Sequence, residues 1–211
     1  DLNGTSGSVV LTNVSVDATG TGVSLTNTSG TVTGNNVDIT GSDTLAVTGG
    51  DAAISFNASS SITSSGGTAV SIASRVGGSF SHFGTVTANG AGSSGISVSG
   101  ATGQSDVTFG GLVSLGQTTA LGGGAGVSFD NNGTTSTLAF DGGLRITTSG
   151  QTGLVGTGGG TLRVSNFASE TITTTGAMAL SLTGLLFHMR SRVSAATLWR
   201  PWRLVRIAAA A

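Results

Sequence analysis

Asp130, Asp141 and Arg145 form the densest group of charged residues in the sequence, so they are the first residues to consider for chemistry. Carboxylates that lie close together can hold a calcium ion through their oxygen atoms. However, Asp130 stands in FDNNG and Asp141 in FDGG, and an aspartate beside Gly or Asn usually serves a turn. We therefore predict no catalytic residue, and Asp130, Asp141 and Arg145 are the first suspects if the chain is an enzyme.

The two histidines, His82 and His188, give little support for a metal site. The chain has no cysteine and no carboxylate stands near either histidine, so neither zinc nor any other cofactor is predicted. His82 lies in SFSHF, where alternation from Phe80 aims its side chain inward or at a corner. A Ser-His-Asp triad stays open because serine is abundant, although no G-x-S-x-G elbow between a strand and a helix occurs.

The composition indicates an ordered β protein. The 211 residues include 37 glycines and one proline, and charged residues make up 8%, about a third of the usual share. Frequent Val, Ile and Thr at regular positions argue against disorder. A net charge of -1 gives no reason to expect a nucleic-acid partner, and no apolar run is long enough for a transmembrane segment.

Short alternating apolar segments recur in sets of three, most clearly between Gly126 and Gly176. The first segment of each set lies at 22–25, 44–47, 69–72, 95–98, 126–129, 153–156 and 179–182. The second lies at 31–34, 52–56, 78–83, 106–109, 136–140 and 161–165, and the third at 36–40, 60–63, 84–88, 112–115, 144–147 and 170–174. Segments 8–11 and 14–17 fit as the last two strands of an incomplete first set.

This repeat predicts an all-β fold, because each segment resembles the segment three places later and equivalent strands should stack in parallel. The expected architecture is a right-handed parallel β-helix, a three-sheet solenoid of about six to seven coils over residues 1–184. Alternation places Val, Ile, Leu and Phe inside and mostly Ser and Thr outside. The insertion Gly116–Gly126 is expected to leave the coil at a corner.

Serine and threonine repeat on the predicted outer surface. An outward serine ladder is expected on the first sheet, at Ser24, Ser71, Ser97, Ser128 and Ser181. The T-x-T pieces at 31–33, 85–87 and 171–173 fall at different sheet positions, so no regular threonine array of the ice-binding kind is expected.

The tail at 185–211 departs from the repeat, since it carries five of the eight arginines, both tryptophans and the one proline. It could be a capping helix, because Leu186, Met189, Val193 and Ala196 have helical spacing. It could also come from an altered reading frame of a GC-rich gene, or form a basic surface-binding helix, which is the least favoured of the three.

The run at 140–184, FDGGLRITTSGQTGLVGTGGGTLRVSNFASETITTTGAMALSLTG, resembles the large bacterial right-handed β-helix repeat proteins. The resemblance to autotransporter passenger regions and adhesins covers about residues 1–184, and its low-complexity motifs identify a repeat class. It implies an extracellular or cell-surface protein. In such proteins another coil follows the ALSL segment, so this chain is expected to belong to a longer one.

Two functions follow as hypotheses. The first is a structural or adhesive stalk that binds glycans or a host surface and has no chemistry of its own, because polar residues are spread evenly. The alternative is a polysaccharide lyase or hydrolase, since lyases of the pectate type resemble this chain in fold and use clustered Asp for calcium with an Arg or Lys base. A hydrolase with an unmarked serine nucleophile is a third possibility.

Overall fold

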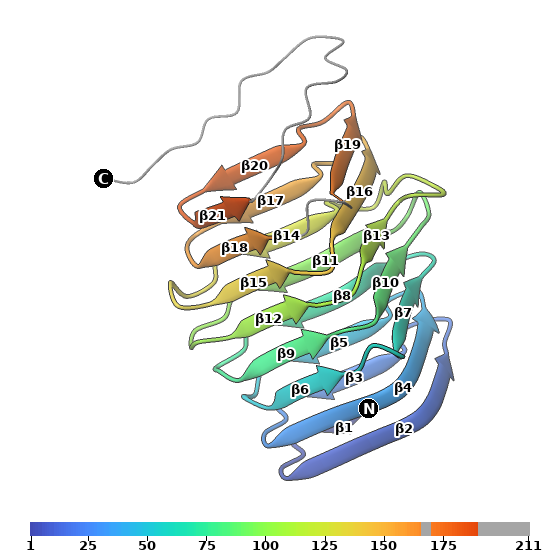
Figure 1. The fold of residues 1–211 in the computed structure, drawn as a ribbon, viewed down its shortest axis with the longest axis vertical. Helices are drawn as coiled ribbons and strands as arrows, with labels where there is room; N and C mark the ends of the chain where they lie inside the picture. The colour runs from blue at the N-terminus through green and yellow to red at the C-terminus, as the bar shows by residue number, and fades with distance from the viewer. Residues whose placement is uncertain (166–169, 190–211) are drawn as a thin grey trace.

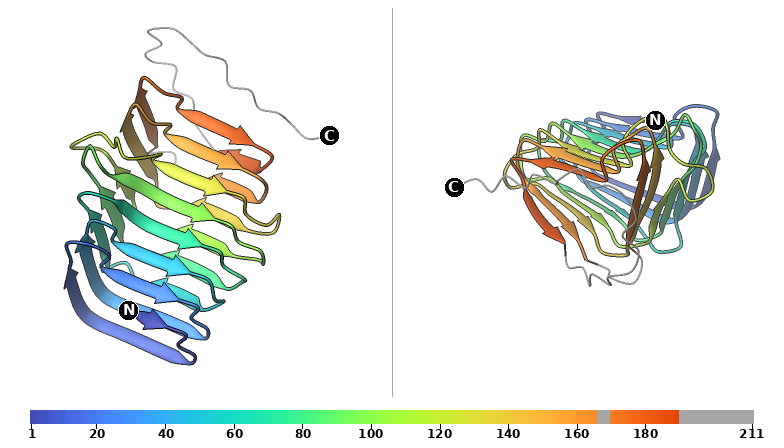
Figure 2. Two further views of the ribbon diagram at one scale, coloured as in Figure 1. Left: turned by 180° about the vertical axis from the view of Figure 1, so that it is seen from behind. Right: turned by 90° about the horizontal axis from the view of Figure 1, so that it is seen from above.

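The computed structural model describes residues 1–165 and 170–189, and these residues form β-strands and turns without a helix. The chain winds as a parallel β-helix of about seven turns (Figure 1), which confirms the predicted fold class. Seen along the column, the coils enclose an interior bounded by three faces (Figure 2). Each predicted strand segment overlaps a strand of the structure, although many of the predicted bounds differ from the observed ones by a residue.

The first predicted segment of each set lies in one eight-stranded sheet, called sheet A here. Its neighbouring strands are all parallel. In spatial order they are β1 (Leu2–Asn3), β3 (Val23–Thr26), β5 (Leu45–Thr48), β8 (Thr68–Ala73), β11 (Ser94–Ser99), β14 (Val127–Asp130), β17 (Leu154–Thr157) and β20 (Leu180–Thr183).

The second and third segments share a 13-stranded sheet, called sheet B, that divides into two arms. Two long strands, β2 (Ser8–Asp17) and β4 (Thr31–Gly41), run through both arms. Arm one continues with β6 (Ala53–Phe56), β9 (Ser79–His82), β12 (Asp106–Phe109), β15 (Thr137–Phe140), β18 (Thr161–Val164) and β21 (Leu186–Met189). Arm two continues with β7 (Ser61–Ser64), β10 (Thr85–Ala88), β13 (Val113–Leu115), β16 (Leu144–Ser149) and β19 (Thr171–Thr175).

The three predicted sheets are therefore three faces, two of which are continuous at the N-terminal end. The cause is a bend inside β2 and β4, where Asn13 and Asn36 adopt positive φ values of 55° and 56°. Asparagine tolerates this left-handed conformation, so each strand turns the corner and remains paired on both sides of it. The segments 8–11 and 14–17 are accordingly two halves of one strand.

Equivalent residues of successive coils lie directly above one another. Inward residues of sheet A form one continuous row along the column, with one residue from each coil: Val23, Leu45, Val70, Ile96, Val127 and Leu154. From Leu45 to Leu154 these side chains are at most 1% exposed, and they belong to a single apolar core that runs along the column. Ala139 alternates outward with its register neighbours, yet it is buried, because it lies in a row between the longer side chains of Thr108 and Arg163.

The corner after each sheet A strand, called the first corner, repeats through the whole column. One residue there has a φ between 50° and 80° in every turn, and its amide hydrogen-bonds the carbonyl of the next coil, except that no such bond is recorded for the last of the series. The series is Gly4, Asn27, Gly49, Ser74, Gly100, Asn131, Gly158 and Gly184. Glycine and asparagine predominate there because most L-residues are strained at positive φ.

The insertion between β13 and β14 leaves at a corner as predicted, but it does not simply bulge outward. Leu121 forms an isolated parallel bridge with Thr148, and its side chain is fully buried in the core. The amide of Thr118 also donates to Asn89 Oδ1 at 3.0 Å. The insertion is therefore anchored to the coil on either side.

The start of the C-terminal tail corrects the predicted boundary at residue 184. Leu186–Met189 form strand β21, which pairs in parallel with β18, so the solenoid continues past Gly184 and no helix begins at Leu186. Val193, Ala196 and the rest of 190–211 lie outside the described residues, and the hypotheses on the tail's origin stay predictions.

Candidate functional site

The three suspected site residues lie on three different parts of the column. Asp130 ends β14 in sheet A, Asp141 directly follows β15 of arm one, and Arg145 lies in β16 of arm two. Asp130 and Asp141 therefore occupy different corners. The fold does not gather them into one pair of carboxylates.

Asp130 and Asp141 each accept a hydrogen bond from a side chain of the next coil. Thr157 Oγ1, which lies opposite Asp130 in strand β17, donates a hydrogen bond to Asp130 Oδ1. Asp141 Oδ2 accepts a bond of 2.9 Å from Arg163 Nη2 in an exposed ion pair. The cationic partner of Asp141 is thus Arg163, a residue that the sequence did not single out for this role.

Arg145 occupies an outward row of arm two. Its register neighbours are Ser114 on one side and Thr171 on the other, and the row continues from Ser114 to Thr87, Thr63 and Thr40. The guanidinium side chain therefore interrupts a run of hydroxyl groups. The threonine row of Thr40, Thr63 and Thr87 ends at Ser114. The ground given for expecting no regular array holds only in part, because the T-x-T pieces at 85–87 and 171–173 both lie in arm two and only 31–33 lies elsewhere.

Other aspartates also connect neighbouring coils. Asp38 Oδ1 accepts a hydrogen bond of 2.6 Å from Ser61 Oγ, and Asp43 Oδ1 accepts one of 2.8 Å from the amide of Thr68. Both partners lie about one coil later in the chain. No group of three His, Cys, Asp or Glu side chains that could hold a metal ion occurs within residues 1–165 and 170–189.

His82 is a core residue and points inward, one of the two orientations that the sequence allowed. Its side chain is fully buried in arm one between Phe56 and Phe109, and its ring centroid lies 5.8 Å from that of Phe56 in an edge arrangement. Nε2 lies 3.2 Å from the carbonyl oxygen of Thr85, and Nδ1 has no hydrogen-bond partner among the described residues. Burial lowers the pKa of His82 below its ordinary value of 6.5, and the bond to Thr85 opposes this shift.

This position rules out His82 as an accessible general base, so no serine triad can be built on it within the described residues. The other histidine, His188, is exposed on β21 and lies in register with Arg163. Neither histidine stands beside a serine and a carboxylate in a hydrogen-bonded series.

Arg75, which sequence reasoning missed, is the largest fully buried side chain of the described residues. Its guanidinium donates to the carbonyl oxygens of Gly49 and Ala52, at 3.3 Å and 2.5 Å. Burial lowers the pKa of Arg75, while attraction to Asp51 acts in the opposite direction. Nothing in the sequence directly indicated that Arg75 is buried and bonded to these carbonyls. In the structure it directly follows Ser74, the residue with positive φ at the first corner.

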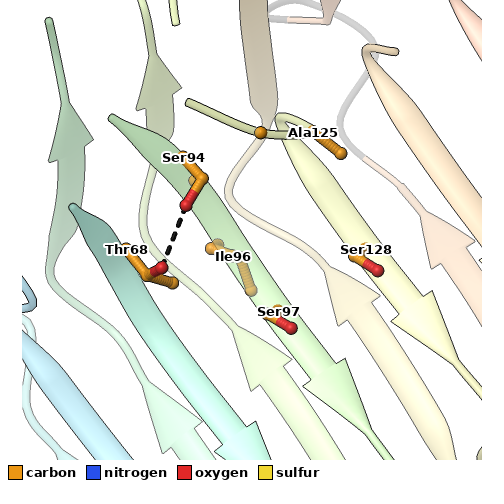
Figure 3. A pocket seen from close by; sticks show the side chains of 8 residues that line it. Thr68, Ser94, Ile96, Ser97, Ala125 and Ser128 are labelled. Atoms are coloured by element: carbon orange, nitrogen blue, oxygen red, sulfur yellow. Dashed lines mark hydrogen bonds between the residues drawn. The ribbon is translucent and has the colours of Figure 1, made fainter. Parts of the chain in front are cut away.

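Sheet A carries the predicted serine ladder and a shallow hollow. Ser71, Ser97 and Ser128 are direct register neighbours, whereas Ala46 and Val155 interrupt the ladder before Ser24 and Ser181. The hollow has a volume of about 210 Å³ and lies beside the insertion before β14 (Figure 3). It is lined by Thr68, Ser94, Gly95, Ile96, Ser97, Gly124, Ala125 and Ser128.

The polar part of this hollow consists of hydroxyl groups without a charged side chain. Thr68 Oγ1 and Ser94 Oγ share a hydrogen bond of 2.9 Å, while Ser97 and Ser128 stand in register farther along the strands (Figure 3). Such a surface can donate and accept hydrogen bonds but holds no titratable group for acid–base chemistry. It therefore suits weak polar contact with a ligand.

Comparison with protein-family models, with curated proteins and with solved structures gives no match for this chain. In the described ranges, no helix is long and apolar enough to cross a membrane.

Proposed function

We propose that this chain is a structural and adhesive β-solenoid stalk of a secreted or cell-surface protein. The observation that carries the proposal is the use of its acidic side chains. Asp38, Asp43, Asp130 and Asp141 each accept a hydrogen bond from the neighbouring coil. Residues that an enzyme would gather into one site instead connect the turns of a column.

The outer surface supports the adhesive part of the proposal. Sheet A presents Ser71, Ser97 and Ser128 in one outward row, and its hollow adds the hydroxyl groups of Thr68 and Ser94. Hydroxyl rows of this kind match the hydrogen-bonding groups of glycans, which are the binding partners that we propose. The extracellular location rests on the resemblance of residues 140–184 to bacterial surface repeat proteins.

A panel of polysaccharides, incubated with the protein in the presence and absence of calcium, tests this function. We expect retention of some glycans on the immobilised protein and no new reducing or unsaturated ends. The matched variants are Asp141→Asn and Arg145→Gln, each of which removes one charge and keeps a side chain of similar size. Bond cleavage that disappears in either variant would establish the polysaccharide-active alternative and overturn the stalk.

A serine-directed fluorophosphonate probe separates the stalk from a serine hydrolase. Because His82 is buried and bound to Thr85, we expect no covalent labelling of the folded chain above the level of a heat-denatured control. Stoichiometric labelling of a single serine would contradict the proposal.

A further inference from the structure

The hollow on sheet A lies where the insertion between β13 and β14 returns to the sheet (Figure 3). This corner spans residues 116–126, whereas the corner that leads into sheet A has five residues or fewer in every other turn from β2 to β20. The amide of Gly123 donates to the carbonyl of Ser93 at 3.0 Å. Gln151 Nε2 donates to the carbonyl of Gly122 at 3.2 Å. The insertion is therefore tied to the coils on both sides and forms a fixed wall beside the hollow.

The lining of the hollow combines hydroxyl groups with apolar surface. Ser94 places its hydroxyl group at one end, and Ser97 lies three residues farther along β11, about 10 Å away. Ser128 stands beside Ser97 on the neighbouring strand. Gly95 and Ala125 line the same hollow without a polar side chain.

This lining matches one pyranose ring. Such a ring carries hydroxyl groups around its edge and C–H groups on its faces, so it can hydrogen-bond the serines and lay a face on the apolar surface. Thr68 Oγ1 and Ser94 Oγ share a single hydrogen bond of 2.9 Å, so the second hydroxyl hydrogen can be donated to a ligand. The volume of about 210 Å³ lies below the roughly 300 Å³ at which pockets for drug-sized ligands begin. One ring therefore fits, and the rest of a glycan chain would lie on the open surface of sheet A.

The strands of sheet A carry no positively charged side chain within the described residues, so nothing on them attracts an acidic sugar. Asp130 is the one charged residue of these strands, and Asp43, at the corner before β5, accepts a bond from the amide of Thr68. The arginines of the described ranges lie elsewhere: Arg75 is buried, Arg145 is on arm two and Arg163 is on arm one. A uronate carboxylate or a sugar sulfate would meet acidic groups on this face, whereas a neutral sugar avoids that repulsion.

We propose that the hollow is a subsite for one uncharged hexopyranose unit of a neutral glycan. This inference rests on the adhesive function proposed above and names the class of glycan that it concerns. Ser94, Ser97 and Ser128 hydrogen-bond the hydroxyl groups of the ring. The wall at residues 124–125 limits the ring substituents that fit.

Paired polysaccharides test the preference for a neutral ligand. Dextran, mannan and galactan are each compared with their carboxymethylated form, so that the backbone stays the same while the charge changes. We expect the immobilised chain to retain at least one neutral polymer, and its carboxymethylated form to have a dissociation constant about tenfold or more higher. In NMR spectra of the labelled chain, the retained neutral ligand should shift the amide signals of Gly95, Ser97 and Gly124.

Two variants change the hollow in different ways. Ala125 is half-buried at its edge, so the ring of Ala125→Phe can extend into the hollow and should weaken binding of the neutral polymer about tenfold or more. Ser128→Arg adds a cation and should raise the affinity for the carboxymethylated form relative to the neutral one. Ser81→Ala, on the outward face of β9 in arm one, is the control and should bind as the unmodified chain does. Circular dichroism checks that each variant keeps the fold.

The outcomes separate this inference from the function on which it rests. A neutral polymer that binds without shifting the signals of the hollow would overturn the subsite and leave the adhesive stalk in place, and this holds even if Ala125→Phe does not fold. Undiminished binding by a folded Ala125→Phe, or equal binding of neutral and carboxymethylated forms, would do the same. Failure to retain any polymer of either kind would instead remove the adhesive function together with the subsite.

Discussion

The two corners that bound arm one are built on different physical grounds. At the first corner, between sheet A and arm one, a residue with positive φ recurs in every turn and its amide extends a ladder of main-chain hydrogen bonds, to which the side chains of Arg75 and Asn132 add bonds. At the second corner, between arm one and arm two, main-chain hydrogen bonds also join successive coils, but positive φ occurs among the described residues only at Asn13, Asn36 and Gly143, and side chains differ from coil to coil. Asn36 Nδ2 donates to Asn13 Oδ1 at 2.9 Å outside, and Phe56, His82, Phe109 and Phe140 lie in one register row inside.

This difference explains why the two corners vary differently along the chain. The backbone requirement at the first corner accepts Gly, Asn or Ser and continues unchanged from Gly4 to Gly184. The second corner changes from a bend inside β2 and β4 to a break between separate strands from β6 onward. A corner held by side chains can change form when its residues change, whereas one set by main-chain conformation repeats.

The largest expected effect comes from the interior of the second corner. Phe109 is fully buried, with its ring stacked on Phe140 at 5.4 Å and tilted toward Phe80 at 5.8 Å. Phe109→Ala should lower the free energy of unfolding by about 3–5 kcal/mol, through lost burial and a cavity. Urea denaturation measures this, with Thr108→Ala as the control on the outward face of the same strand. A loss below 1 kcal/mol would contradict a side-chain-built corner.

His82 makes the same corner sensitive to acid. Because its pKa is lowered by burial, the folded state binds its proton less readily than the unfolded state does. Stability is therefore unaffected by this group above pH 6.5, and falls as the pH drops below the unfolded value toward the lowered folded one. The slope contributed by one histidine is at most about 1.4 kcal/mol per pH unit.

The matched variant for this pH dependence is His82→Phe, which continues the row of Phe56, Phe109 and Phe140. Denaturation at pH 7, 6 and 5 should show a smaller loss of stability in the variant than in the unmodified chain. Equal losses in both chains would mean that His82 is not held neutral in the core.

The first corner should respond to backbone conformation instead. Gly100 has a φ of 65°, and the nearest atom to a Cβ added there lies 3.7 Å away, so steric contact is not the issue. Gly100→Val should cost about 1–2 kcal/mol, because a β-branched residue is strained at positive φ. Gly100→Asn is the control and should cost much less, since Asn27 and Asn131 occupy equivalent positions. Equal losses would refute a main-chain origin for this corner.

The smallest expected effect lies on the surface of the second corner. The ion pair between Asp141 and Arg163 is exposed, so salt and water screen it. Asp141→Asn should change the free energy of unfolding by about 1 kcal/mol or less, with the difference shrinking as salt is added. Arg145→Gln is a control, because Arg145 has only Ser114 and Thr171 as register neighbours. A large loss insensitive to salt would show that Asp141 does more than pair with Arg163.

The sequence predicted the strands well because their requirements are local. Alternating segments such as 69–72 and 144–147 show which side chains face inward, and their recurrence in threes indicates the parallel stacking. The residues of the first corner could not be picked out in the same way, because Gly, Asn and Ser are frequent throughout the chain and only some of them adopt positive φ. What the sequence did not show was that Asn13 and Asn36 bend a strand without ending it.

The partners of the charged residues could not be predicted either. The pairing of Asp141 with Arg163, and the burial of Arg75 on the carbonyls of Gly49 and Ala52, depend on which residues meet between adjacent coils. These distances in sequence vary from coil to coil, because the loops differ in length. From the sequence alone, a charged residue that only serves a turn cannot be told from one that pairs with the adjacent coil. The two can be distinguished once the register between the coils is known.

The most direct test of the stacked coils is a set of spin-label distances along sheet A. Ser24, Ser97, Ser128 and Ser181 lie in one outward row, with Ser97, Ser128 and Ser181 three, four and six coils from Ser24. With labels on introduced cysteines, double electron–electron resonance should give distances from Ser24 of about 14, 19 and 29 Å, a rise of about 4.8 Å per coil. Distances that do not rise in this order would contradict the β-helix and everything inferred from it.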